Sequence, residues 1–494
     1  MQLGTAPSSS TTPLGWRPAT PVYEPRCAEA TVLHRVLSRH LVPFLDQART
    51  DEGQGVPLFV ERELRRFLAC GDLRRGFARV HCDDCHKDRL VPFSCKGRGF
   101  CPSCGGRRMA ERAAHLVDHV LPPVPFRQWV LSLPYALRYR MAYDHELCRA
   151  VLAVMTRALM SFQRQRAKKI GITDPTDPHT GTVTVIQRFG GGLRLNVHFH
   201  TLLPDGVFVI DETTGATSFI ELPPPTDDDV ARLVLTIGRR IARLLERRGL
   251  LTDPYDDQAD EAPALAALQQ ASIRGVRALG PEAGRLVARL RNPALARPAP
   301  SARPLHAHLE GFDLHAAVAI DADDRDALER LCRYLGRPAI AQDHLKQLDS
   351  GQVRVELRHP WSDGTTHLDF TPHELIGRLA AFVPRPRVNL VLYHGVFAPN
   401  AKHRSAVVSY GREAEPAPAA DNAAAQPNAS PPRYWAWADL MRRAFGIDVL
   451  ECPECGGRMR VLTTITDSKI ISAILDHLAG RGPPSAPPPP SLLH

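Results

Sequence analysis

Two pairs of cysteines, each pair separated by two residues, constrain the fold of this chain more than any other feature. Cys82 and Cys85 form the first pair, and Cys101 and Cys104 form the second after fifteen intervening residues. Each pair predicts a tight turn whose two thiolates point at one ion, and two such turns complete the tetrahedral shell of a structural zinc site. We therefore expect one zinc ion on these four cysteines, with the glycines after Cys104 supplying positive φ angles and close backbone approach.

Further cysteines lie beside these pairs and near the C-terminus. Cys70 and Cys95 could replace a ligand or support a second site, although ordinary packing is the expected role for each. Cys452 and Cys455, in "CPECGG", repeat the turn as a single pair, and His477 is the only nearby histidine that follows. Two thiolates leave two coordination positions to fill. The alternatives are a second zinc site, a half-site without metal, and a site shared with another chain.

The charge of the chain favours a polyanionic partner. The 494 residues carry 62 Lys and Arg against 53 Asp and Glu, a net charge of +9, and nucleic acid is the obvious candidate. The basic residues next to the zinc pairs are expected to contact phosphates: Lys96, Arg98, Arg107 and Arg108. The N-terminal stretch does not resemble a secretory signal, and no apolar run approaches the ~20 residues of a membrane helix. We expect a cytoplasmic, nucleoid-associated bacterial protein without a membrane partner.

Composition divides the chain into six expected segments. The linker has no large apolar residue, and the two terminal segments are rich in Ser, Thr and Pro or in Pro alone. The segments are a disordered N-terminus (1–25), a helical and zinc-binding domain (26–115), a catalytic domain (116–410) with a helical insertion at about 225–300, a flexible linker (411–432), a small C-terminal unit (433–479) and a Pro-rich tail (480–494).

The stretch "LNVHFHTLLPDGVF" (195–208) predicts a strand with two histidines on one face. Strict alternation places Leu195, Val197 and Phe199 on the core face, and His198 and His200 on the other. The Pro-Asp-Gly sequence that follows predicts a hairpin with residues 207–210. Strands are also expected at 126–133, 181–189, 313–320 and 388–396, with a hairpin formed by "QVRVEL" and "HLDF". Together these patterns favour an α+β fold with an antiparallel sheet.

Two imidazoles on one strand face can bind one divalent ion. Imidazole suits Zn, Cu, Fe and Ni, and a site that also contains carboxylate or phosphate oxygens can accept Mg or Mn. Asp313 and His315 are candidates for a third ligand, but no spacing selects either one.

Several long segments resemble the rolling-circle transposases of the insertion-sequence 91 family, which belong to the HUH endonuclease superfamily. His198-Phe199-His200 has the form of the HUH motif, and the resemblance runs from about residue 55 to 480. The segments that carry it are "SCKGRGFCPSCGGRRMAERAAHL", "TVTVIQRFGGGLRLNVHFHTLLPDGVF", "LERLCRYLGRPAIA", "RHPWSDGTTHLDFTPHELIGRLAAFVP" and "YHGVFAPNAKHR".

The resemblance implies a palm-like HUH domain that nicks and rejoins single-stranded DNA at insertion-element ends. A Mg²⁺ or Mn²⁺ ion on His198 and His200 would polarise the scissile phosphate, and a tyrosine would form a 5′-phosphotyrosine adduct. The implied partners are single-stranded or hairpin DNA at transposon ends and target DNA. Two alternatives stay open: a zinc-dependent DNA-binding protein without nuclease activity, and a replication initiator or relaxase.

Tyr334, in "LERLCRYLGRP", matches the family position of the nucleophile on a helix downstream of the histidine strand. Leu328, Leu331 and Leu335 are expected to form the buried stripe of this helix, and the flanking Arg330, Arg333 and Arg337 are expected to contact DNA. Some relatives carry a second tyrosine four residues earlier, where this chain has Arg330, so it is similar to the single-tyrosine "common region" branch. Two schemes are compatible with a single tyrosine: the same tyrosine is used twice, or each chain of a homodimer supplies one. Tyr135, Tyr139, Tyr143 and Tyr393 are the rival tyrosines.

Overall fold

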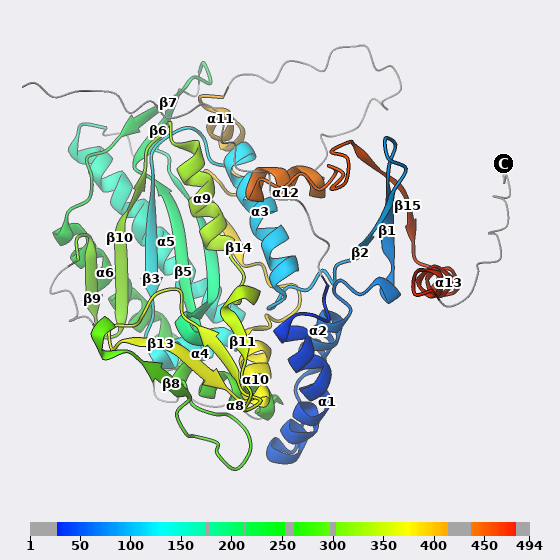
Figure 1. Cartoon of the computed structure of the whole chain (residues 1–494). Helices are drawn as coiled ribbons and strands as arrows, with labels where there is room; N and C mark the ends of the chain where they lie inside the picture. The colour runs from blue at the N-terminus through cyan, green and yellow to red at the C-terminus, as the bar shows by residue number, and fades with distance from the viewer. Residues whose placement is uncertain are drawn as a thin grey trace, which may run out of the picture.

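A six-stranded antiparallel sheet forms the centre of the structure, a computed structural model that describes residues 27–172, 178–211, 213–251, 261–296, 303–412 and 436–480. Its strand order is β14-β4-β5-β3-β10-β9 (Figure 1). The strands are β3 (Phe126–Ser132), β4 (Gly181–Gly190), β5 (Arg194–Pro204), β9 (His306–Leu309), β10 (Phe312–Ile320) and β14 (Val391–Gly395). The strands expected at 126–133, 181–189, 313–320 and 388–396 are confirmed, and the fold is α+β with antiparallel sheets.

The histidine strand β5 pairs with β4 through a glycine turn and with β3 on its other side. Gly192 has φ +69°, and a Cβ atom there would overlap the side chains of Leu368 and Trp361, so this turn requires glycine. The expected hairpin between β5 and residues 207–210 is wrong. Strand β6 (Gly206–Ile210) pairs instead with β7 (Thr217–Glu221), because β5 already has a hydrogen-bonded neighbour on each edge.

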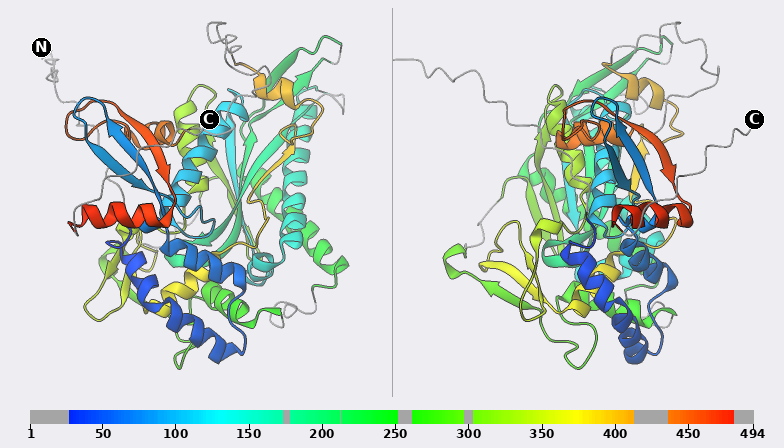
Figure 2. Two further views of the ribbon diagram at one scale, coloured as in Figure 1. Left: turned by 90° about the vertical axis from the view of Figure 1, so that its right-hand side faces the viewer. Right: turned by 45° about the vertical axis from the view of Figure 1, so that its right-hand side comes forward.

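Helices cover both faces of the central sheet (Figure 2). On one face, α4 (Tyr135–Tyr143), α5 (His145–Lys169) and α8 (Pro263–Arg274) pack with Leu195, Val197 and Phe199 in the largest hydrophobic core. On the opposite face, α3 (Pro102–His119) and α9 (Arg325–Gly336) enclose a second core that includes Val183 and Leu202. The histidine strand is therefore buried on both faces.

The N-terminal part begins with the expected helices, α1 (Val32–Glu52) and α2 (Leu58–Leu68). Helix α3 begins at Pro102, directly after Cys101, because proline is well suited to the first helical position. Gly105 and Gly106 are consequently helical, so the expected positive φ angles after Cys104 are wrong. Close approach is confirmed at Gly105, where a Cβ atom would lie 2.8 Å from Pro338.

The expected helical insertion at 225–300 is helical only in part. Helices α6 (Asp227–Arg247) and α8 are followed by β8 (Ala288–Arg291), which joins a second sheet of order β11-β12-β13-β8. Its other strands are β11 (Leu345–Gln347), β12 (Val353–Glu356) and β13 (Thr365–Phe370), so the hairpin expected from "QVRVEL" and "HLDF" is confirmed. Helix α10 (Pro372–Phe382) follows β13 and packs against α8 and α1.

A third sheet combines the two ends of the described chain. Its order is β15-β1-β2, from β1 (Phe77–Cys82), β2 (Asp88–Pro92) and β15 (Met459–Ile465). The helices α11 (Arg404–Ser409), α12 (Trp437–Phe445) and α13 (Ser468–Leu478) complete the C-terminal half. The expected N-terminal segment (1–25), residues 413–432 of the expected linker and residues 481–494 of the expected Pro-rich tail (480–494) lie outside the described residues. Within the described residues, no helix is both long enough and apolar enough to cross a bilayer.

Candidate active site and metal centres

The two histidines of β5 point their Nε2 atoms at one another. The Nε2 atoms of His198 and His200 lie 3.0 Å apart, and the two residues are 8% and 4% exposed. The Nδ1 atom of His198 lies 2.9 Å from the carbonyl oxygen of Asn196, and the Gln128 side-chain amide lies 2.7 Å from the Nδ1 atom of His200. With metal–nitrogen bonds of about 2.1 Å, two neighbouring ligands of one ion have nitrogens about 3 Å apart. The pair therefore fits a shared divalent ion.

Both imidazoles are held in the neutral form that binds metals. Burial lowers the pKa of His198 to about 4, and the positive charges of Arg138 and Arg337 act in the same direction. Burial also lowers the pKa of His200 to about 3, assisted by His198 and by Arg337. Near pH 7 both rings are therefore neutral, and a metal ion can bind without first displacing the extra proton of an imidazolium.

The described residues place no third His, Cys, Asp or Glu in one group with this pair. The expected candidates Asp313 and His315 lie on β10, which is separated from β5 by β3, and Asp313 bonds to the imidazole of His306 at 2.8 Å. Two buried side-chain amides lie on the strands that pair directly with β5: Gln128 on β3, and Gln187 on β4 opposite His198. Sequence reasoning missed both glutamines, because only the register of β3 and β4 against β5 reveals them.

Tyr334 lies beside the histidine pair, as the resemblance predicts. Its ring centre is 6.0 Å from that of His200 at an interplanar angle of 85°, and its side chain is 42% exposed. The guanidinium carbon of Arg337 is 4.1 Å from the centre of the tyrosine ring. The buried stripe of α9 consists of Leu328, Cys332 and Leu335, whereas the expected member Leu331 is half-buried.

The rival tyrosines lie on other elements. Tyr135, Tyr139 and Tyr143 belong to α4, where Tyr139 and Tyr143 pack against each other with ring centres 5.2 Å apart. Tyr393 lies on β14, separated from β5 by β4, and burial raises the pKa of its phenol. An attacking phenol must lose its proton, so burial of Tyr393 works against that role.

The first metal centre brings together four buried cysteines: Cys70, Cys95, Cys101 and Cys104. The Sγ–Sγ distances are 3.4 Å for Cys95–Cys104, 3.5 Å for Cys70–Cys101 and 3.9 Å for Cys70–Cys104. A tetrahedral zinc with Zn–S bonds of about 2.3 Å has sulfurs about 3.8 Å apart. The backbone N–H of Gly97 donates to the Cys95 sulfur at 3.3 Å. This cluster fits a closed structural zinc site.

The expected grouping of Cys82 and Cys85 with Cys101 and Cys104 is wrong. Cys82 and Cys85 lie instead with Cys452 and Cys455 in a second four-cysteine group. The reason is the intervening strand: β1 carries Cys82 about 17 Å along an extended chain from its first residue. Cys70 and Cys95, expected to be packing residues, occupy the two positions that this leaves in the first group.

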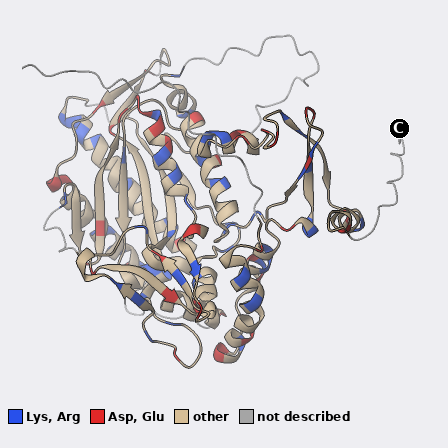
Figure 3. Cartoon of the chain, viewed as in Figure 1, with Lys and Arg blue, Asp and Glu red and all other residues tan. Residues whose placement is uncertain are grey.

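The basic residues named from the sequence divide into two sets. Three donate to backbone carbonyl oxygens: Arg98 to Val388, Arg108 to Gly97 and Lys96, and Arg333 to Ala444. The side chains of Lys96, Arg107 and Arg330 are exposed. In the view of Figure 3, Lys and Arg positions are spread over several helices, with Asp and Glu positions among them.

Two hollows are lined in part by the elements that carry the histidines and the tyrosine: the first by the end of α9, the second by the start of β5. The first lies between the first cysteine cluster and the end of α9, and its lining includes Arg98, Arg108, Arg112 and Arg337. Burial lowers the pKa of Arg112, and the neighbouring charges of Arg108 and Arg98 lower it further. Such a concentration of like charges favours a bound anion.

The second hollow is lined by aromatic and basic side chains near the start of β5. It includes Tyr135, Arg138, Arg194 and Trp361. The guanidinium carbons of Arg194 and Arg289 lie 5.0 and 5.3 Å from the Trp361 ring, and that of Arg138 lies 4.6 Å from the Tyr135 ring. Aromatic faces beside guanidinium groups are typical of surfaces that stack nucleic-acid bases.

Comparison with known families agrees with this arrangement. Residues 181–405 match the family described as "Putative transposase", a range that includes His198, His200 and Tyr334. Residues 37–133 match the family described as "Transposase zinc-binding domain", which includes all four cysteines of the first cluster. No curated protein and no solved structure is significantly similar to the chain.

The fold, the cysteine cluster and these matches define a DNA-processing enzyme of the transposase class that carries a zinc-binding domain. Within this class, the chain belongs to the insertion-sequence 91 type transposases.

Proposed function

We propose that this transposase nicks and rejoins single-stranded DNA at insertion-element ends through a 5′-phosphotyrosine on Tyr334, as rolling-circle transposition requires. The observation that carries the proposal is the position of the tyrosine ring, 6.0 Å from the ring of His200 and on the exposed rim of α9. A nucleophile must be accessible to DNA and adjacent to the group that binds the scissile phosphate, and this tyrosine meets both conditions.

The chemistry is a transesterification in two reversible steps. The hydroxyl oxygen of Tyr334 attacks the scissile phosphorus, a new O–P bond forms, and the bond to the 3′ oxygen breaks. The departing strand takes up a proton as a free 3′-hydroxyl, and the other strand stays joined to the enzyme by its 5′ phosphate. Attack by another 3′-hydroxyl reverses the step and releases the tyrosine, so no ATP is consumed.

The residues around the tyrosine support these steps. A Mg²⁺ or Mn²⁺ ion held by the Nε2 atoms of His198 and His200 would polarise the scissile phosphate as a Lewis acid. The guanidinium of Arg337 lies over the Tyr334 ring, where a fixed positive charge stabilises the developing phenolate. Because burial keeps both histidines neutral, they can serve as metal ligands at neutral pH.

Each of the two hollows would bind part of a single strand near the reacting phosphate. The arginine-lined hollow beside the first cysteine cluster would bind backbone phosphates. The hollow that contains Tyr135 and Trp361 would stack unpaired bases. Since unpaired bases are needed for stacking, the arrangement favours single-stranded DNA, or a hairpin with a single-stranded flank, as the substrate.

A single tyrosine on α9 limits each chain to one adduct at a time. The position four residues earlier holds Arg330, whose side chain is exposed. Exchange between donor and target strands would then require either the release and reuse of Tyr334 or a second tyrosine from another copy of the chain.

A covalent-adduct assay tests the proposal. The full chain is mixed with labelled single strands from the DNA flanking its gene, with Mn²⁺ or with EDTA, and run on a denaturing gel. We expect a metal-dependent protein–DNA band that is lost in Tyr334→Phe and retained in the matched control Tyr139→Phe. A band that survives Tyr334→Phe would transfer the role to another tyrosine. DNA binding without any band would instead support a protein that only binds DNA.

A further inference from the structure

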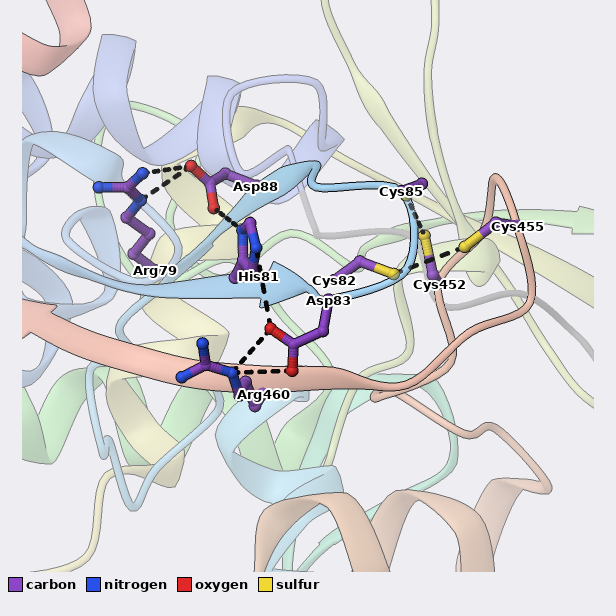
Figure 4. A network of polar contacts seen from close by, with 9 residues as sticks. All are labelled: Arg79, His81, Cys82, Asp83, Cys85, Asp88, Cys452, Cys455 and Arg460. Atoms are coloured by element: carbon purple, nitrogen blue, oxygen red, sulfur yellow. Dashed lines mark hydrogen bonds and ion pairs between the residues drawn. The ribbon is translucent and has the colours of Figure 1, made fainter.

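The second group of cysteines joins parts of the chain that are far apart in sequence. Cys82 ends β1, Cys85 follows in the turn toward β2, and Cys452 and Cys455 precede β15 (Figure 4). The Sγ–Sγ distances are 3.5 Å for Cys82–Cys455 and 3.6 Å for Cys85–Cys452, and one ligand atom from each cysteine lies within 4.8 Å of all the others. Disulfides need about 2.05 Å between sulfurs, whereas zinc thiolate sites need about 3.8 Å.

We propose that Cys82, Cys85, Cys452 and Cys455 bind a second structural zinc ion that fixes the C-terminal segment to the N-terminal hairpin. Residues 436–480 lie outside both family matches, so neither match supplies the second half of this site. The inference concerns the folding of the chain and does not depend on the proposed DNA chemistry.

The backbone around the four sulfurs has the geometry of two facing metal-binding turns. Gly456 has φ +72°, and the N–H of Gly457 donates to the Cys455 sulfur at 3.4 Å. A Cβ atom at Gly457 would overlap the carboxylate of Asp84 in the opposite turn, so the two turns approach as closely as glycine permits. N–H donors directed at sulfur stabilise a thiolate, which is the form that binds zinc.

Charged side chains hold the two turns in register. Lys87 pairs with Glu454 across the site. The Arg460 Nε atom lies 2.9 Å from a carboxylate oxygen of Asp83, as Figure 4 shows. Each of these two cations is paired with a carboxylate, so the ion pairs position the two turns and leave the charge of the thiolates to the metal.

The small sheet has too little apolar core to hold together by packing alone. Its hydrophobic cluster contains four buried residues, of which two are the ligands Cys82 and Cys452 and the others are Val80 and Met459. Protein units with so few buried apolar groups generally require a metal or disulfides. Six residues of β1 pair with β15, and the metal would stabilise that pairing.

The decisive experiment combines zinc content with cysteine labelling of the full chain. We expect two zinc ions per chain, one for each four-cysteine group, and the loss of one in the Cys452→Ser/Cys455→Ser double variant. Cys27→Ser is the matched control, because Cys27 belongs to neither group, and it should retain both ions. One zinc in the wild type and one in the double variant would overturn the proposal.

Labelling of the wild-type protein keeps the proposal testable if the double variant fails to fold. Cys27 and Cys455 are both exposed, so iodoacetamide should label both rapidly if neither binds metal. We expect rapid labelling of Cys27 and at least tenfold slower labelling of Cys455 until a chelator removes the zinc. Equal labelling rates before chelation would overturn the proposal. Because neither readout involves DNA, failure here is distinct from failure of the strand-transfer proposal.

Discussion

The guanidinium carbon of Arg337, the residue that caps the C-terminus of α9, lies 4.1 Å from the centre of the Tyr334 ring. The same arginine contributes to the lowered pKa of both His198 and His200. It therefore acts on the proposed nucleophile and on the proposed metal ligands, and it also lines the arginine-rich hollow. This position makes it the cation best placed to stabilise negative charge during the reaction.

Arg337→Ala is expected to lower the rate of adduct formation about 10- to 100-fold at saturating DNA, because the developing phenolate loses its nearest cation. Single-turnover kinetics measure this rate directly. Arg337→Lys should restore part of it, and Arg240→Ala, at an exposed position on α6, is the charge-matched control. If Arg337→Ala weakened DNA binding but left the saturated rate unchanged, the arginine would serve only to hold DNA.

Gln128→Ala is expected to raise the Mn²⁺ concentration required for half-maximal adduct formation about 10- to 100-fold. The Gln128 amide lies 2.7 Å from the Nδ1 atom of His200 and orients that imidazole; with its oxygen toward Nδ1–H, it would select the tautomer whose Nε2 atom binds metal. A titration of Mn²⁺ at fixed DNA concentration provides the measurement. The same titration with Gln187→Ala tests the other buried amide. A rise in the required Mn²⁺ concentration in that variant alone would assign the support of the metal site to Gln187 on β4.

The sequence predicts individual elements of the site better than it predicts their partners. Alternation identifies both faces of the histidine strand, because side chains alternate with a period of two. It cannot show that β5 pairs with β3 and β4, and so the Pro-Asp-Gly turn leads to a wrong hairpin prediction. For the same reason Gln128 and Gln187 were missed, since their proximity to the histidines depends on strand register.

The cysteines also show that the sequence predicts local turns better than it predicts which turns lie together. The spacing of two residues predicts each metal-binding turn, and six of the eight cysteines in the two groups lie in such pairs, whereas Cys70 and Cys95 do not. Cys82 and Cys101 nevertheless belong to different groups. Spacing alone cannot decide which turns share an ion, because the ligand Cys455 is brought to Cys82 by the pairing of β1 with β15.

Trp361→Ala is expected to weaken the binding of single-stranded DNA by about 1–3 kcal/mol, the usual value for loss of one stacked base. The guanidinium carbons of Arg194 and Arg289 lie 5.0 and 5.3 Å from the centre of the indole, and Trp361 lines the hollow beside β5. Fluorescence anisotropy with a labelled single strand measures the loss. Trp361→Phe should retain most of the affinity, because it preserves an aromatic face. An equal loss for single-stranded and fully duplex DNA would argue against stacking at this residue.

Arg443→Ala is expected to lower the free energy of unfolding by about 1–3 kcal/mol. Arg443, on α12, forms four hydrogen bonds with two carboxylates: two with Asp118 on α3, at 2.6 and 2.9 Å, and two with Glu329 on α9, at 2.7 and 2.9 Å. These bonds link the C-terminal segment directly to the helix that carries Tyr334. Chemical denaturation of the full chain gives the free energy.

The same variant should slow adduct formation while leaving DNA affinity largely unchanged, because α9 loses a support and the proposed DNA-binding surface keeps its residues. In the Arg443→Ala background, Glu329→Gln should recover part of the lost stability, because it removes a half-buried carboxylate that no longer has this partner. Arg442→Ala is the control on the neighbouring position, where the guanidinium bonds to Asp448 within the C-terminal segment. Equal effects of the two arginine variants on the adduct rate would show that α12 does not position the tyrosine helix through Arg443.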